Sequence, residues 1–173
     1  MPDCRTSTRD LSGQLRILPR RPGIRQRIAW NWSHGEATRR EDFGDPLANG
    51  TFTFCVFDES GSRPTVAFSA ATRSGMCGNL PCWTANAGGF RYRSTDGAPS
   101  GLRQLSLKAG ADGQAKILLA GKGVDLTLPT LPLGLALRAQ LRGAGDACWE
   151  SVYDEAGVAR NTPGEFRAKS SQQ

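Results

Sequence analysis

The sequence contains a single histidine, His34, and this scarcity limits the catalytic chemistry open to the protein. A Ser-His-Asp or Cys-His arrangement needs an imidazole base that a second group holds in place. His34 lies between Ser33 and Gly35, in a stretch that predicts the end of a strand followed by a turn, where a histidine is usually solvated. We therefore expect no histidine-dependent catalysis and no histidine-ligated catalytic metal.

Other missing motifs exclude further classes of protein. The sequence has no Gly-x-Ser-x-Gly elbow, no P-loop and no dinucleotide-binding glycine fingerprint, so no cofactor is expected. No apolar run approaches the roughly 18 residues that a membrane span requires. The first residues also lack the apolar segment of a signal peptide, so export would depend on a leader missing from this start.

Carboxylates are plentiful, and a pair of them is the remaining route to an enzyme. Asp42 and Asp45, in the stretch EDFGDP, are the best pair by proximity, although Asp before Pro more often marks a turn. A secreted carboxylate-dependent hydrolase is therefore kept as an alternative. Our preferred expectation is a protein without catalytic activity.

Positive charge is concentrated near one end of the chain. The net charge is +6, and residues 1–40 contain nine arginines but three acidic residues, whereas the rest of the chain has 13 of each sign. The stretch RILPRRPGIRQR carries no interleaved aromatic side chain on which bases could stack, so no specific nucleic-acid partner is expected. We predict a basic, partly disordered arm over residues 1–24 and a neutral body.

Apolar side chains alternate with polar ones through most of the chain. In RQRIAWNWS, Ile28, Trp30 and Trp32 fall on one face, and FRYR and LPLGLALRAQLRG follow the same period of two. The 21 glycines and 10 prolines gather in short turn segments between such stretches. This pattern predicts an all-β fold, a single antiparallel, Greek-key-like β-sandwich of about eight to ten strands over residues 25–169, with a tail over residues 170–173.

Two of the predicted strands end in similar turns, CVFDESG at residues 55–61 and SVYDEAG at residues 151–157. In each, the Asp side chain can accept hydrogen bonds from the next backbone N–H groups, and the Gly tolerates a positive φ. A calcium site would need six or more oxygen ligands, and no loop with ligand spacing accompanies either turn. We therefore expect turn chemistry here and no metal site.

Seven motifs follow one another over about residues 25–169: DFGDP, FTFCVFDESG, CGNLPCW, GFRYRSTDGAPSGLRQLSLKAGADGQAKILLAGKG, LPTLPLGLALRAQLRG, ACWES and FRAKS. This order resembles that of a group of uncharacterised, secreted, β-rich domains from environmental bacteria. The resemblance implies export, a β-rich fold and a place beside other modules at the cell surface. It assigns no activity, ligand or site residue.

The five cysteines suggest a disulfide framework. Cys77 and Cys82 enclose a glycine and a proline that can turn the chain so that the two sulfur atoms meet. Cys55 and Cys148 lie in distant apolar strands and are predicted to form a second disulfide across the sandwich, which leaves Cys4 over. A zinc site is the weaker alternative, because no second short-spaced pair of ligands exists. A redox-active pair would normally be Cys-x-x-Cys at the start of a helix.

Trp83 and Trp149 each follow a cysteine directly. If those cysteines point into the core, the next side chains point outward, and an outward tryptophan is a stacking surface for sugar rings or for a protein partner. Tyr153 is a third candidate binding residue. The alternative is that each tryptophan packs within the core, since tryptophan is highly buried on average.

The sequence favours a non-catalytic, exported structural or adhesion-type module of unknown ligand at the bacterial cell surface. The first alternative is a carbohydrate-binding module that uses exposed tryptophans, and the second is the secreted hydrolase. We expect a monomer with a glycan or protein partner. A glycan-binding measurement on Trp83→Ala and Trp149→Ala variants would separate the first two possibilities.

Overall fold

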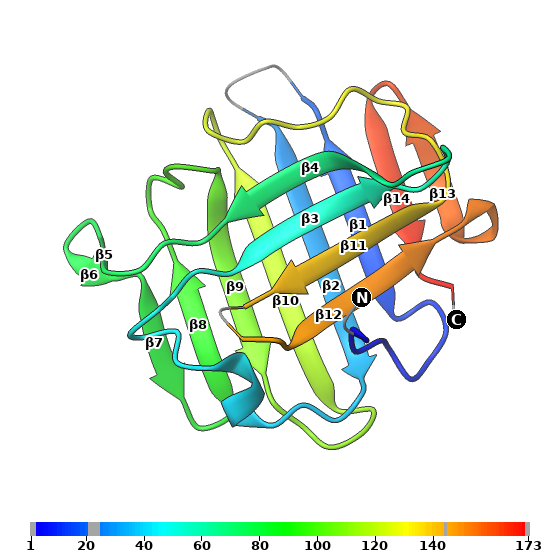
Figure 1. Cartoon of the computed structure of the whole chain (residues 1–173). Coiled ribbons are helices and arrows are strands. Elements are labelled where there is room, and N and C mark those ends of the chain that lie inside the picture. The colour runs from blue at the N-terminus through cyan, green and yellow to red at the C-terminus, as the bar shows by residue number, and fades with distance from the viewer. Residues whose placement is uncertain (1–2, 21–24, 144, 172–173) are drawn as a thin grey trace.

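The computed structural model describes residues 3–20, 25–143 and 145–171, which form two facing antiparallel sheets (Figure 1). The larger sheet has eight strands, in the order β13 (Val158–Thr162), β14 (Glu165–Lys169), β1 (Gly13–Leu18), β2 (Arg27–Gly35), β10 (Ala115–Lys122), β9 (Leu102–Lys108), β8 (Gly89–Arg93) and β7 (Trp83–Asn86). The smaller sheet has four, in the order β12 (Cys148–Tyr153), β11 (Leu137–Arg142), β3 (Thr53–Asp58) and β4 (Thr65–Ala71). In Figure 1 the strands of the smaller sheet cross in front of those of the larger sheet at a wide angle.

The all-β, antiparallel sandwich predicted from the sequence is confirmed. The described residues contain 14 strands, against the eight to ten expected. Two of the additional strands, β5 (Met76–Cys77) and β6 (Leu80–Pro81), form a separate hairpin and are too short to show any alternation. Two short 3-10 helices, η1 (Arg40–Phe43) and η2 (Glu155–Gly157), lie in the connections, and the described part of the chain has no helix long and apolar enough to cross a membrane.

The core lies between the sheets and follows the alternation seen in the sequence. In β2, Ile28, Trp30 and Trp32 face the smaller sheet and are buried. The indole N–H of Trp30 donates a hydrogen bond to the hydroxyl of Tyr153, 3.1 Å away, and the rings of Trp30 and Phe54 lie 5.2 Å apart. The buried face of β2 therefore contacts both β12 and β3.

The N-terminal segment belongs to the sandwich, so the prediction of a partly disordered arm over residues 1–24 is wrong for most of that segment. β1 lies between β14 and β2 and pairs with both. Leu15 and Ile17 are at 0% exposure, whereas Arg16 between them is exposed. The many nearby arginines obscured this short alternation in the sequence. Residues 21–24 lie outside the described residues.

The predicted tail over residues 170–173 also begins as ordered structure. The backbone N–H of Ser170 donates to the carbonyl of Gly13 over 2.6 Å, and the Ser170 hydroxyl accepts a hydrogen bond from the Gly13 N–H over 2.8 Å. Ser171 forms an isolated bridge with Val152 in β12. The two described residues of the tail therefore join the larger sheet to the edge of the smaller one.

One of the two predicted disulfides is wrong. Cys148 is bonded to Cys4, with the Cα atoms 4.7 Å apart, and Cys55 is a free thiol. Cys55 lies in β3 and Cys148 in β12, and β11 separates these two strands. Two interstrand spacings amount to about 9.6 Å, beyond the roughly 7 Å between Cα atoms that a disulfide can span. The sequence predicted the strand in LPLGLALRAQLRG but not its place between β3 and β12.

The other disulfide, between Cys77 and Cys82, is confirmed. It closes the β5–β6 hairpin, in which Cys77 pairs with Leu80, and Gly78 takes a positive φ of 74° at the turn. A glycine suits this position because it lacks the Cβ atom that makes a positive φ unfavourable. The stretch SGMCGNLPCW is therefore a disulfide-closed turn.

Candidate binding face

The three aromatic residues predicted to bind a ligand are all buried. Trp83 is 3% exposed, and Trp149 and Tyr153 are 0% exposed. The indole of Trp83 donates a hydrogen bond to the carbonyl of Gly50 over 2.8 Å, and that of Trp149 donates to the hydroxyl of Thr38 over 3.2 Å. Burial also raises the pKa of the Tyr153 hydroxyl. The prediction of a tryptophan-based binding surface is therefore wrong.

The error came from the assumed direction of the neighbouring cysteines. Cys148 points away from the core and is covered by the N-terminal segment, which its disulfide to Cys4 holds in place, so Trp149 points inward. Cys82 precedes β7 rather than lying in it, so alternation along a strand does not fix the direction of Trp83. A cysteine on the outer face of a strand reverses the direction inferred for the next residue.

His34 is exposed near the end of β2, with its Nδ1 atom 3.3 Å from the hydroxyl of Ser12. We expect His34→Ala to change the free energy of unfolding by no more than about 0.5 kcal/mol, as is usual for surface substitutions. Denaturant unfolding of the two proteins measures this difference. A loss well beyond that range would show that the contact with Ser12 stabilises the fold.

The carboxylates considered for a hydrolase are used in local structure. Asp42 accepts a hydrogen bond from the backbone of Arg39 over 2.7 Å and forms an ion pair with Arg5 at 3.0 Å. Asp45 accepts from the backbone N–H groups of Leu47 and Ala48. Both residues therefore organise the connection from β2 to β3.

The two similar turns use their aspartates as the sequence predicted, but neither Gly61 nor Gly157 takes the positive φ that was expected there. Asp154 accepts a hydrogen bond from the Gly157 N–H over 3.0 Å. Asp58 accepts from the hydroxyl and the backbone N–H of Ser60, and these hydrogen bonds lower the pKa of its carboxyl group. The described residues contain no cluster of three or more histidine, cysteine or acidic side chains that could hold a metal ion.

The outward face of the larger sheet carries a row of residues whose order the strand register fixes. Each residue of the row is directly paired with the next one on the neighbouring strand. From β14 to β8 the row is Arg167, Arg16, Ala29, Ala120, Gln104 and Arg93. Arginines therefore occupy both ends of the row, and two methyl side chains occupy its middle. Short side chains between long ones leave the centre of this face hollow.

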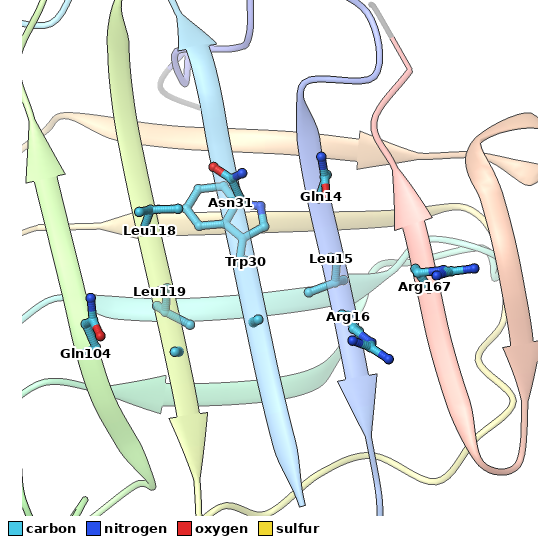
Figure 2. A pocket seen from close by; sticks show the side chains of 11 residues that line it. Gln14, Leu15, Arg16, Trp30, Asn31, Gln104, Leu118, Leu119 and Arg167 are labelled. Carbon is cyan, nitrogen blue, oxygen red and sulfur yellow. The ribbon is translucent and has the colours of Figure 1, made fainter.

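Two adjoining hollows follow from this arrangement, with volumes of about 490 and 540 Å³. They share Arg16, Ala29, Gln104 and Ala120. Figure 2 shows the first hollow with the smaller sheet behind it: Gln14, Arg16 and Arg167 project from β1 and β14, and Asn31 lies on β2. We call the outward-facing residues of the two hollows the basic face: Gln14, Arg16, Arg27, Ala29, Asn31, Arg93, Arg103, Gln104, Leu118, Ala120, Lys122 and Arg167.

The basic face is strongly positive. Its twelve residues include six cations and no carboxylate, and no acidic residue lines either hollow within the described chain. Arg16 forms an ion pair at 2.9 Å with Glu165, which lies on β14 beside the face. In the part of the chain that the structure describes, the other five cations make no ion pair.

The outward face of the smaller sheet shows the opposite arrangement. Arg138 forms ion pairs with Glu59 and Glu150, each at 2.8 Å, and the hydrogen bond with Glu59 raises the pKa of its guanidinium group. The side chain of Gln140 donates to Glu150 and accepts from Arg142. The cations of this face are therefore bound within the protein, whereas five of the six cations of the basic face have no carboxylate partner in the described chain.

Comparisons with protein-family models, with curated proteins and with solved structures find no match to this chain. The geometry and charge of the basic face are therefore the basis for its proposed function.

Counting charges by segment concealed the basic face. The body of the chain sums to zero, but the fold gathers cations from six strands on one side of the larger sheet. A signal was present in the alternation itself, because QLRIL, FRYR and FRAK each place arginine opposite an apolar face. A sum of charge over the outward positions of predicted strands would have detected it.

Proposed function

We propose that this protein is a non-catalytic, exported module that binds a polysaccharide on the basic face. The observation that carries the proposal is the hollowed, outward surface of the larger sheet, lined by six cations and by the amides of Gln14, Asn31 and Gln104. Five of those cations have no ion pair in the described chain. Amide groups both donate and accept hydrogen bonds, which suits the hydroxyl groups of sugars. The extended, shallow form of the two adjoining hollows suits a polymer.

Two further observations support the export and the absence of catalysis in this proposal. The two disulfides are typical of proteins in oxidising compartments. The residues that line the hollows, within the described chain, include no histidine, carboxylate or thiol that could act as a nucleophile or general base. The tryptophans play no part in the proposed binding, because they are buried.

Filling the centre of the basic face tests the proposal. Ala29 is exposed and lies in both hollows, so Ala29→Tyr should obstruct the site without disturbing the core, and tyrosine is favourable in a strand. In affinity gel electrophoresis with neutral and acidic polysaccharides, we expect at least one polymer to retard the wild-type protein. The protein should not cleave or modify that polymer. Ala29→Tyr should weaken that retardation by about tenfold or more, the effect of losing a well-placed contact region.

The matched control is Ala85→Tyr, which makes the same change at an exposed position of β7 outside both hollows. It should bind as the wild type does. The proposal would be contradicted if no polysaccharide in the panel retarded the protein, or if Ala29→Tyr and Ala85→Tyr behaved alike.

A further inference from the structure

Two pairs of like charges face each other directly on the basic face. Arg16 in β1 is paired in register with Arg167 in β14, and Arg27 in β2 is paired with Lys122 in β10. Like charges at directly opposed positions of a sheet destabilise the pairing of the strands. Within the described chain the one carboxylate that relieves them is Glu165, which contacts Arg16. The four cations therefore share a single carboxylate in the described chain, and a ligand could supply further anions.

We infer that the ligand of the basic face is an acidic polysaccharide, whose carboxylates are bound by these opposed cations. The inference rests on the proposed function and names the class of polymer. A guanidinium group presents a planar fork of N–H donors that matches both oxygen atoms of a carboxylate. A carboxylate placed between Arg16 and Arg167 would accept from both and remove their repulsion.

The spread of the cations indicates a polymer rather than a small anion. The row from Arg167 to Arg93 crosses six neighbouring strands. Five interstrand spacings of about 4.8 Å give roughly 24 Å between its ends. A single sugar or phosphate group would reach the cations at one end of the row, whereas a chain laid across the strands reaches both. Ala29 and Ala120 leave room for sugar rings between the two ends.

The side chains of the face favour a polysaccharide over a nucleic acid. Proteins that hold single strands stack the bases on exposed aromatic rings. The one aromatic residue lining the described hollows is Trp30, which is 1% exposed and points into the core. Duplex DNA is bound mainly through its phosphates, and binding of that kind is one outcome of the experiment below.

The test uses two polymers that differ in charge but share a backbone, polygalacturonate and its methyl ester. Isothermal titration with the full chain at low salt should show binding of polygalacturonate that is about tenfold or more tighter than binding of the ester, because esterification removes the charge-assisted hydrogen bonds. A short DNA duplex serves as the third probe and should bind more weakly than polygalacturonate.

A charge-removing variant locates the site. In the double variant Arg27→Gln, Arg167→Gln, one member of each opposed pair is replaced, and neither residue has an ion pair in the described chain. We expect affinity for polygalacturonate to fall by about tenfold or more. The melting temperature should stay the same or rise, because two repulsions are relieved. Loss of binding without loss of stability separates a ligand contact from a structural role.

The control Arg63→Gln removes the same type of charge from an exposed turn between β3 and β4 and should leave binding unchanged. Equal binding of the ester and the acid, with sensitivity to Ala29→Tyr, would overturn the inference and leave the proposed function standing. Tighter binding of the duplex, or equal losses in Arg63→Gln and the double variant, would also overturn it. If neither galacturonan binds, the inference fails, and the neutral polysaccharides decide the proposed function separately.

Discussion

Replacing Cys4 and Cys148 together by alanine is expected to lower the free energy of unfolding by about 5 kcal/mol, the value that loop entropy gives for a bridge between residues so far apart. Their sequence separation is 144. The disulfide also holds Arg5 against β12. The backbone N–H of Arg5 donates to the carbonyl of Cys148 over 2.9 Å, and the carbonyl of Arg5 accepts from the backbone N–H of Glu150. Urea unfolding under oxidising conditions measures the loss.

Two controls accompany this variant. Replacing Cys77 and Cys82 opens a bridge of sequence separation 5, for which the same relation gives about 2 kcal/mol. Cys55→Ala removes a half-buried free thiol outside the buried core and should cost less than about 0.5 kcal/mol. An equal or larger loss at the short bridge would show that the long bridge does not constrain the unfolded chain as described.

Deletion of residues 1–18 should abolish the fold. It removes β1, which lies between β14 and β2, and so detaches β13 and β14 from the rest of the larger sheet. It also removes the fully buried side chains of Leu15 and Ile17 and the Cys4 disulfide. The combined loss approaches or exceeds the roughly 5–15 kcal/mol of stability that a typical domain possesses.

Circular dichroism and calorimetry provide the measurement, and we expect no cooperative thermal transition for the shortened chain. Deletion of residues 1–3 is the control, since it retains both β1 and Cys4, and it should leave the transition near that of the full chain. A shortened chain that still melted cooperatively would show that β1 is a dispensable addition to the sheet.

The fold class followed from the sequence because period-two alternation is a local property. Ile28, Trp30 and Trp32 could be assigned to one buried face from their spacing alone, and the structure confirms that assignment. The Cys77–Cys82 bridge was equally local, since both partners flank one turn. Features set by neighbours along the chain were therefore predictable.

Features set by the order of strands were not. The pairing of Cys148 depended on β11 lying between β3 and β12, which no local pattern encodes. The direction of Trp149 depended on whether Cys148 faced the core or the N-terminal segment. The basic face likewise depended on β1, β2, β8, β9, β10 and β14 presenting their outward side chains together. Each of these requires knowledge of which strands are adjacent.

The position of β1 has a consequence for the order of events during biosynthesis. Gln14 pairs with Lys169 and Cys4 is bonded to Cys148, so the segment before β2 completes its contacts through residues synthesised much later. Contacts between residues so distant in sequence slow folding, because the intervening chain must be ordered before they form. The larger sheet therefore stays incomplete until β14 has been synthesised, and until then Leu15 and Ile17 lack the neighbours that bury them on that side.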